Sequence, residues 1–252
     1  CLSLKVFTYS PNGGTDSLLS NDTMTQSILY GLNGSYTINP SASATSTNYK
    51  TFTSAISDMV SGTRSDGGTA NGPAISGAVT FNVSNGTYNE QLNITNITNA
   101  TLTNSITFQS ASGDSSAVVL SWAASGSSTN NFTVFLNGAS YFHFKKMAIK
   151  RNGSGTYANT VEIDNGGHNN SFEHCQIFSV PSINTSTTQC PIYHNNTTNA
   201  PDSGNLFDQN YIKDGSSSIY WYKSAAGNDY HNMFTNNIIK DGYYYQCYFY
   251  YQ

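Results

Sequence analysis

Apolar residues recur at a fixed spacing in the C-terminal half of the chain. Four segments share a Phe that is followed five residues later by an Ile: Phe144 and Ile149, Phe172 and Ile177, Phe207 and Ile212, and Phe234 and Ile239. The four Phe residues lie 28, 35 and 27 positions apart. Short apolar–polar alternations surround them, as in strands, and a repeat of this length indicates a solenoid or a propeller.

A parallel β-helix explains the repeat better than a propeller does. Each repeat holds two or three short strands, whereas a propeller blade has four strands and usually about 40 residues or more. In a parallel β-helix, equivalent residues of successive coils stack about 4.8 Å apart, so the Phe residues form one internal column and the Ile residues another. The sequence therefore predicts an all-β fold, a right-handed single-stranded parallel β-helix of about six coils.

The separation of five predicts a bend between each Phe and its Ile. Residues five apart on a straight strand face opposite sides, so both point inward only if the chain turns between them. The residue two before each Ile then also faces inward; these residues are Met147, Cys175, Asn210 and Asn237. We expect Asn210 and Asn237 to form a hydrogen-bonded ladder, because an unpaired buried amide costs about 1–3 kcal/mol. The 35-residue interval marks a coil with an inserted loop within residues 179–204.

The N-terminal part differs from the repeats. Residues 1–31 contain two strand-like runs around a turn-rich connection, and we interpret them as the C-terminal hairpin of an Ig-like domain plus a linker. Residues 32–252 are assigned to the β-helix domain. A capping helix is predicted over about residues 50–62, because Thr51 or Thr53 can cap it, Gly62 can end it, and one face is apolar. That face comprises Phe52, Ile56, Met59 and Val60.

Both ends of the sequence fall within strand-like runs. The chain starts with Cys1 in a run that already alternates, and it stops inside a Tyr-rich run. We interpret both ends as cuts, so that the β-helix is truncated at its C-terminal end. The alternative for Cys1 is the lipid-bearing residue of a mature bacterial lipoprotein.

Composition excludes several function classes. Only 10% of the residues are charged, the net charge is −4, and no basic patch of the kind that binds nucleic acid is visible. No apolar run is long enough to span a membrane. Asn, Ser, Thr and Gly replace the usual charged residues, and there are eighteen Tyr. We therefore expect a hydrogen-bonding surface, no nucleic-acid partner and no membrane insertion.

Two of the repeats resemble a known family. The segments "NLFDQNYIKDG" and "NMFTNNIIKDG" are similar to the parallel β-helix repeat of pectin-lyase-like proteins. The order of segments over most of residues 8–180 resembles modules of very large secreted surface proteins of Bacteroidetes, in which Ig-like and β-helix domains alternate. The resemblance implies a secreted, extracellular location at the cell surface, export by the type IX system and, for some members, a role as gliding-motility adhesins.

The function predicted is that of a structural or adhesive module in a large cell-surface protein, with glycan binding by its Tyr-rich strands as an option. Its expected partners are neighbouring domains of the same chain, surface polysaccharides, or the secretion and motility machinery. The resemblance leaves two alternatives. One is a polysaccharide lyase or glycoside hydrolase of the pectin-lyase-like class, and the other is a phage tailspike-like fibre.

Carboxylates are the candidate catalytic residues for the enzyme alternative. Asp214 and Asp241 occupy one repeat position, each in Lys-Asp-Gly, and two carboxylates about 5 Å apart can perform retaining glycoside hydrolysis. Asp-Gly is also a turn dipeptide, which already explains both residues, so we expect no catalysis from them. Glu162, Asp164 and Glu173 are scattered in the sequence. We expect an enzyme less than a non-enzymatic module.

No metal ion or cofactor is expected, because neither the Cys nor the His residues show metal-ligand spacing. The five His residues are expected mostly at solvent-facing positions: His143, His168, His174, His194 and His231. The lyases of the resembling superfamily place an Arg or Lys beside a calcium site. Arg64 and Arg151 are the two Arg of this chain, and we expect Arg151 in a turn.

The remaining predictions concern thiols and modification. Cys175 is expected to be a buried thiol, and Cys190 and Cys247 to be unpaired, because strands two coils apart lie about 9–10 Å from each other and a disulfide reaches about 7 Å. Ser17 and Thr23 lie in "DSL" and "DTM", which resemble the short O-glycosylation signal of Bacteroidetes.

Overall fold

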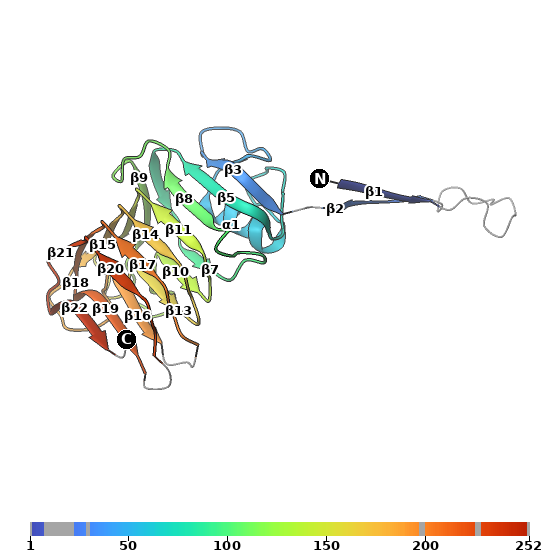
Figure 1. Cartoon of the computed structure of the whole chain (residues 1–252). Coiled ribbons are helices and arrows are strands. Elements are labelled where there is room, and N and C mark those ends of the chain that lie inside the picture. The colour runs from blue at the N-terminus through green and yellow to red at the C-terminus, as the bar shows by residue number, and fades with distance from the viewer. Residues whose placement is uncertain (1, 8–22, 29–30, 197–199, 225–227, 251–252) are drawn as a thin grey trace, which may run out of the picture.

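The chain forms a parallel β-helix. The computed structural model describes residues 2–7, 23–28, 31–196, 200–224 and 228–250. Three parallel sheets run along the axis, and the chain passes from sheet 1 to sheet 2 to sheet 3 in each of six successive coils between β5 and β22 (Figure 1). The predicted fold class and the number of coils are confirmed.

The sheets have the following hydrogen-bonded order. Sheet 1 comprises β20 (Met233–Thr235), β17 (Leu206–Asp208), β14 (Ser171–Glu173), β11 (Phe142–Lys145), β8 (Ile106–Ser110), β5 (Ile75–Val83), β3 (Leu32–Ile38) and β4 (Asn48–Tyr49). Sheet 2 comprises β21 (Ile238–Lys240), β18 (Tyr211–Gly215), β15 (Gln176–Pro181), β12 (Ala148–Asn152), β9 (Val118–Ala123) and β6 (Gly86–Asn89). Sheet 3 comprises β22 (Tyr245–Tyr250), β19 (Ser217–Lys223), β16 (Ile192–Asn196), β13 (Val161–Asp164), β10 (Val134–Asn137) and β7 (Leu92–Ile94).

A separate hairpin precedes the β-helix. Strands β1 (Leu2–Phe7) and β2 (Thr23–Ile28) pair antiparallel and form a two-stranded sheet of their own. The predicted hairpin is therefore present, whereas its membership of an Ig-like domain stays a prediction. Of the residues predicted here, Cys1 and Ser17 lie outside the described residues, and Thr23 is the first residue of β2.

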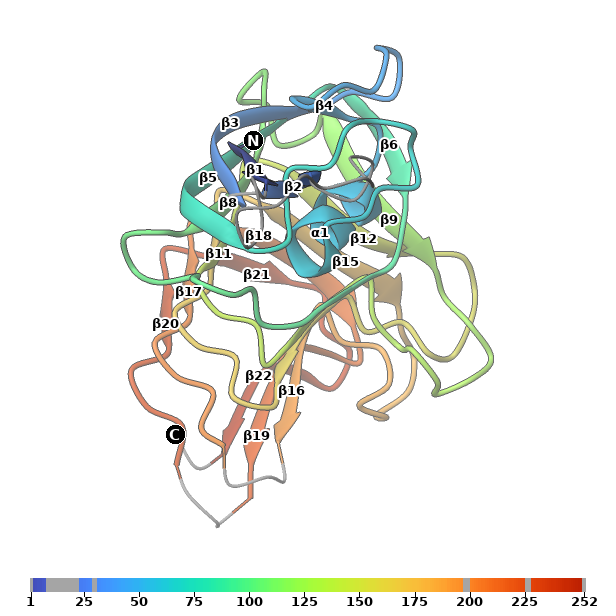
Figure 2. The same cartoon turned by 90° about the vertical axis from the view of Figure 1, so that its right-hand side faces the viewer.

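One helix, α1 (Phe52–Ser61), covers the N-terminal end of the core (Figure 2). Its boundaries follow from its caps: the Thr51 side chain accepts a hydrogen bond from the Ser54 amide, and Gly62 ends the helix in the left-handed conformation at φ 67°. Phe52 is fully buried, with its ring 5.3 Å from that of Phe108. Val60, which was expected on the same face, is 48% exposed.

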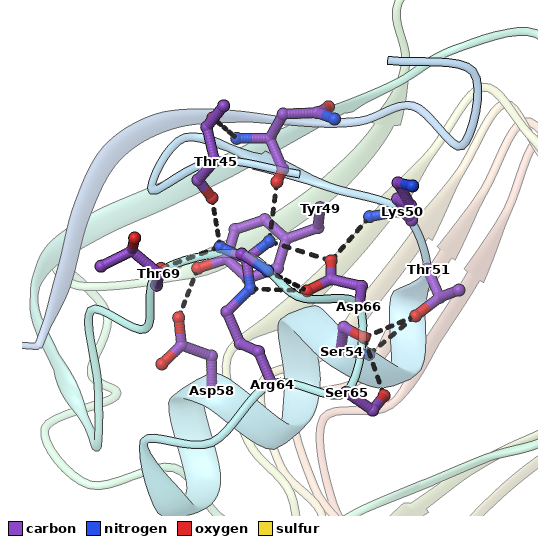
Figure 3. A network of polar contacts seen from close by, with 12 residues as sticks. Thr45, Tyr49, Lys50, Thr51, Ser54, Asp58, Arg64, Ser65, Asp66 and Thr69 are labelled. Atoms are coloured by element: carbon purple, nitrogen blue, oxygen red, sulfur yellow. Dashed lines mark hydrogen bonds and ion pairs between the residues drawn. The ribbon is translucent and has the colours of Figure 1, made fainter. Parts of the chain in front are cut away.

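Arg64 fixes the cap rather than a ligand site (Figure 3). Its guanidinium lies 3.7 Å from the centre of the Tyr49 ring and donates to both carboxylate oxygens of Asp66. The Tyr49 hydroxyl in turn donates to Asp58 of α1 at 2.6 Å. The Arg64 guanidinium also donates to the carbonyls of Thr45, Asn48 and Thr69, so it joins β4 and the loop before it to the loop that follows the helix.

The predicted columns are confirmed residue by residue. Phe144, Phe172, Phe207 and Phe234 are in register on neighbouring strands of sheet 1, and their rings stack with centroids 4.8–5.1 Å apart. The four Ile residues are in register in the same way on sheet 2. Toward the N-terminus, Phe108 and Phe81 extend the first column. The core is therefore built from stacked like residues.

The predicted bend lies between sheets 1 and 2. One residue in each coil adopts a left-handed conformation there, with φ between 53° and 55°: Lys146, His174, Gln209 and Asn236. The next residue points inward. Asn210 is 2% exposed; its Oδ1 accepts from the Cys175 amide, and its Nδ2 donates to the Phe172 carbonyl and to Oδ1 of Asn237. The Asn ladder is therefore confirmed.

A second Asn ladder, which we had not predicted, lies at the corner between sheets 3 and 1. Asn170 Nδ2 donates to Oδ1 of Asn205 at 3.0 Å, and Asn205 Nδ2 donates to Oδ1 of Asn232 at 3.1 Å. The same Oδ1 atoms accept the backbone N–H groups of Asn170 and Asn205. Both ladders pair backbone groups that the corners would otherwise leave unsatisfied.

All described Cys residues are free, as predicted. Cys175 is buried below Asn210, and burial raises the pKa of its thiol to about 12. Cys190 is buried just before β16, and Cys247 is exposed in β22, two coils further on. Because Cys247 is in register with Ile219, and Ile219 with Ile192, Cys190 is also two residues out of line with Cys247.

Candidate binding face and cleft on sheet 3

Five Tyr residues form two rows on the outward surface of sheet 3, here called the tyrosine face. The first row is Tyr193, Tyr220 and Tyr248, with ring centroids 5.7 and 5.1 Å apart. The second row is Tyr222 and Tyr250, with centroids 5.2 Å apart. Neighbouring rings within each row are inclined by 14° or less, so each row presents a continuous aromatic strip.

Strand parity produces the tyrosine face. In β19 the buried residues Ile219 and Trp221 alternate with Tyr220 and Tyr222, which are partly exposed. Because β16, β19 and β22 are parallel and in register, the outward Tyr residues of successive coils lie beside one another. The second row ends at Tyr250, which is 42% exposed.

A cleft of about 380 Å³ lies at the Tyr193 end of the tyrosine face. Its floor is formed by Phe135, Glu162 and Tyr193, which are in register on β10, β13 and β16. Its walls are formed by the connections from sheet 2 to sheet 3 in three coils, including the inserted loop predicted within residues 179–204. The wall residues are Ser128, Asn130, Asn131, Phe132, Tyr157, Asn159, Thr187 and Thr188.

The walls of the cleft are tied together by buried polar groups. Oδ1 of Asn131 accepts from the Asn159 amide, and Oδ1 of Asn159 accepts from the Cys190 amide, which gives a third Asn ladder. Arg151 donates to the carbonyls of Phe132 and Tyr157 at 2.7 and 2.8 Å. The prediction that Arg151 lies in a turn is therefore wrong: it belongs to β12 and is 3% exposed, because its long side chain fills this corner of the coil.

Glu162 is the carboxylic acid on the floor of the cleft. Burial and the neighbouring carboxylate of Asp164 raise the pKa of Glu162 to about 8, although His194 opposes the shift. Burial likewise raises the pKa of Tyr193 to about 12. At neutral pH Glu162 is therefore mainly a neutral carboxylic acid, which donates a hydrogen bond as well as accepting one.

A cluster of ionisable side chains lies inside the last coils, behind the tyrosine face. His194, Asp202, Lys223 and Asp229 have fully buried side chains. His194 Nδ1 lies 2.6 Å from the carbonyl oxygen of Ile163, and its Nε2 lies 2.8 Å from Oδ2 of Asp229. The expectation that His residues face solvent is wrong for His194, because it shares the inward parity of Ile192 on β16.

The contacts of His194 indicate an imidazolium ion. A carbonyl oxygen only accepts, so Nδ1 carries a proton; a carboxylate faces Nε2, which favours a second proton there. The Nε2 contact is an ion pair whose angle falls outside the hydrogen-bond range. Burial opposes the charged form, but the contacts with Asp229 and the Ile163 carbonyl outweigh it and raise the pKa of His194.

The same contacts argue against a metal ion at this cluster. Ligand atoms of Asp164, His194 and Asp202 lie within 4.8 Å of one another, which is close enough for a shared ion. However, Nδ1 of His194 donates to a carbonyl and has no lone pair to offer. The positive charges of His194 and Lys223 already balance the negative charges of Asp202 and Asp229. The cluster is therefore a set of buried ion pairs.

A chain of hydrogen bonds on sheet 1 contains Ser, His and Glu but lacks the order of a nucleophile site. Ser171 Oγ donates to Oε1 of Glu173 at 2.7 Å, so His143 Nδ1, also 2.7 Å away, acts as a donor to Ser171. An activated Ser instead donates its proton to the His. Lys145 pairs with Glu173 at 3.2 Å, and the group is a surface network of sheet 1.

Asp214 and Asp241 lie one coil apart, as predicted. Both have left-handed backbone conformations, with φ of 69° and 62°, which agrees with the turn interpretation. Lys213 Nζ lies 3.4 Å from Asp214 and 3.7 Å from Asp241. The structure thus brings together the two carboxylates and a lysine on the surface, while Glu162 and Asp164 lie on another sheet. Their lack of a catalytic role stays a prediction.

Comparisons with known proteins add little to this description. No protein-family model and no curated protein matches the chain. Among solved structures, the chain is similar to a pectin methylesterase from Erwinia chrysanthemi, with 15% sequence identity and a TM-score of 0.39 over 77% of this chain. The match spans 56% of that enzyme's length. Among the residues that the structure describes, no helix has the length and apolar character needed to cross a membrane.

Proposed function

We propose that this chain is a glycan-binding adhesive module and that the tyrosine face is its binding surface. The observation that carries the proposal is the pair of stacked Tyr rows on sheet 3. A Tyr side chain combines apolar contact area with a hydroxyl group that forms hydrogen bonds. An extended glycan chain lying along a row would meet equivalent rings at a constant spacing, because the coils repeat.

The wider role follows the sequence resemblance. The module is part of a large secreted protein at the cell surface of a Bacteroidetes bacterium, it is exported by the type IX system, and it is joined to neighbouring domains of the same chain. In this setting the β-helix serves as a rigid spacer, and sheet 3 presents the glycan contacts. The support for this part is the order of segments in residues 8–180.

A binding experiment tests the proposal. A glycan array with the purified chain should give carbohydrate ligands, and the double variant Tyr220→Ala/Tyr222→Ala should weaken their binding about tenfold or more, because each stacked ring contributes on the order of 1 kcal/mol. Tyr243→Ala is the matched control, because Tyr243 is 55% exposed and lies between sheets 2 and 3 of the last coil. Unchanged binding by a folded double variant would overturn the proposal.

One observation favours a second candidate, a glycoside hydrolase or lyase. Glu162 lies in a cleft, and its pKa of about 8 suits a general acid at neutral pH. Release of reducing sugar or unsaturated product from a polysaccharide panel, abolished in Glu162→Gln, would establish that function. If the chain binds the polysaccharides without turning them over, the glycan-binding function is supported and the enzyme is not.

A further inference from the structure

The cleft offers a ligand more than aromatic contact. Phe135 and Tyr193 flank Glu162 on the two neighbouring strands, so a carboxyl group lies between two rings on the floor. Amide side chains of Asn131 and Asn159 are in the walls, and both are fixed by the buried ladder that ends at Cys190. The polar groups of the cleft are therefore held in place before a ligand arrives.

The Glu162 carboxyl is available for a ligand. Other carboxylates of the chain have close partners: Glu173 accepts from Ser171, and Asp208 accepts from Thr235. No described donor forms a hydrogen bond with Glu162, although the residue is only partly exposed on the cleft floor. A ligand that supplies a hydrogen-bond partner would satisfy a group that the protein leaves unsatisfied.

Charge restricts the class of ligand. No Lys or Arg is among the residues that line the cleft. Arg151 lies behind the wall and directs its guanidinium at carbonyl groups. The ionisable groups that interact with Glu162 are Asp164 on the same strand, and Tyr193 and His194 on β16. His194 faces the core and is paired with Asp229, so a uronate carboxylate in the cleft would be desolvated beside two acidic residues without a cation to pair with it.

We propose that the cleft binds one uncharged sugar unit of a glycan that extends over the tyrosine face, with the Glu162 carboxylic acid donating a hydrogen bond to a sugar oxygen, and that it rejects uronate units. This proposal rests on the proposed glycan-binding function and adds its substrate class. The raised pKa of Glu162 supports it, because the donating acid form persists through neutral pH.

The test compares sugars and pH values. Probes are matched oligomers of glucose, galactose and mannose with their uronate and 2-amino counterparts, and Kd is measured from pH 6 to pH 9.5. We expect a neutral series to bind at least about tenfold more tightly than its uronate counterpart. Wild-type affinity should be constant at pH 6–7 and fall by about tenfold in total by pH 9.5, because the donor proton and its hydrogen bond are lost.

Three variants separate the carboxylic acid from general effects. Glu162→Gln keeps a donor at every pH, so its affinity should stay near the wild-type value at pH 6 and lose the decline at high pH. Glu162→Ala should bind more weakly throughout. Asp164→Asn removes the neighbouring negative charge that raises the pKa of Glu162, so the midpoint of the decline should move to lower pH than in the wild type if Glu162 is the titrating group. Circular dichroism confirms that each variant is folded.

Each outcome supports or overturns the proposal. Preference for uronate or amino sugars, or an identical pH profile in wild type and Glu162→Gln, would overturn this inference while the glycan-binding function stands. Absence of binding to every sugar at every pH would overturn the proposed function, and this inference with it.

Discussion

Asn210 and Asn237 lie one coil apart, and Nδ2 of the first donates to Oδ1 of the second at 3.0 Å. Oδ1 of Asn237 also accepts the backbone N–H of Asn210 at 2.9 Å, while Nδ2 of Asn237 donates to the Phe207 carbonyl. One side chain thus satisfies two backbone groups at the bend of the preceding coil. The bend allows Phe and Ile columns to share one core.

We expect Asn210→Ala to destabilise the chain by about 3–5 kcal/mol, because it removes the side-chain partner of the Cys175 amide and of the Phe172 carbonyl and one of the two donors to Oδ1 of Asn237. Asn93→Ala is the control; Asn93 is exposed on β7, and its loss should change the free energy of unfolding by less than about 0.5 kcal/mol. Denaturant unfolding measures both. Equal stabilities would show that the ladder contributes nothing.

Phe172→Ala should cost about 3–5 kcal/mol, because the ring is fully buried between Phe144 and Phe207 and its removal leaves a cavity inside the column. Phe178→Ala is the matched control on the outside of sheet 2, where the ring contacts Lys150 and Tyr211. Its cost should be below about 1.5 kcal/mol. A similar loss for the two variants would contradict the core assignment.

The sequence predicted those parts of the fold that repeat along the axis. Phe and Ile recur with equal separation, so parity together with a bend between them places both residues, and the Asn that follows the bend, inside. The second ladder had the same kind of signal, because Asn170, Asn205 and Asn232 each precede a column Phe by two residues. The alternation around Ile192 also indicates that His194 faces inward, but we expected a surface position because His is polar.

The sequence did not predict the cleft, because the cleft does not repeat along the axis. Glu162 was noted only as a scattered carboxylate, because its environment depends on three connections of unequal length that meet over sheet 3. Nothing periodic relates Thr187 to Asn131, yet both are in the walls. The tyrosine face was predicted in part. The Tyr-rich strands suggested stacking on sugars, but the two rows could be identified only from the register of β16, β19 and β22.

His194 should make the stability of the core depend on pH. Its pKa is raised in the folded chain, so its contribution is fully present below the unfolded value of about 6.5 and is lost as pH rises through the folded pKa. The Tm difference between wild type and His194→Gln should therefore be largest near pH 6 and shrink at alkaline pH. Breaking a buried ion pair costs about 3–5 kcal/mol, which sets the size at pH 6.

His231→Asn is the control for His194, because His231 is exposed and has φ 58°, a conformation that Asn tolerates. Its Tm should follow the wild-type profile at every pH. If the Tm difference between wild type and His194→Gln were constant from pH 6 to pH 10, His194 would not be charged in the folded chain.

Ionisation of Glu162 should lower the stability of the folded chain as pH rises. Its folded pKa of about 8 lies above the unfolded value of about 4.3, so the stability it provides in acid is lost as pH rises from roughly 4 to 8. The amide introduced by Glu162→Gln cannot ionise, so the free energy of unfolding of this variant should match that of the wild type at pH 4 but exceed it by roughly 1–4 kcal/mol at pH 9.

Glu173→Gln is the matched control: burial opposes ionisation there, but Ser171 and Lys145 outweigh it and lower the pKa of Glu173. That variant should be less stable than the wild type at pH 9 and equal to it in strong acid. Unfolding free energies at pH 4 and pH 9 test both signs, and a Glu162→Gln variant that is no more stable than the wild type at pH 9 would show that the carboxyl on the cleft floor ionises normally.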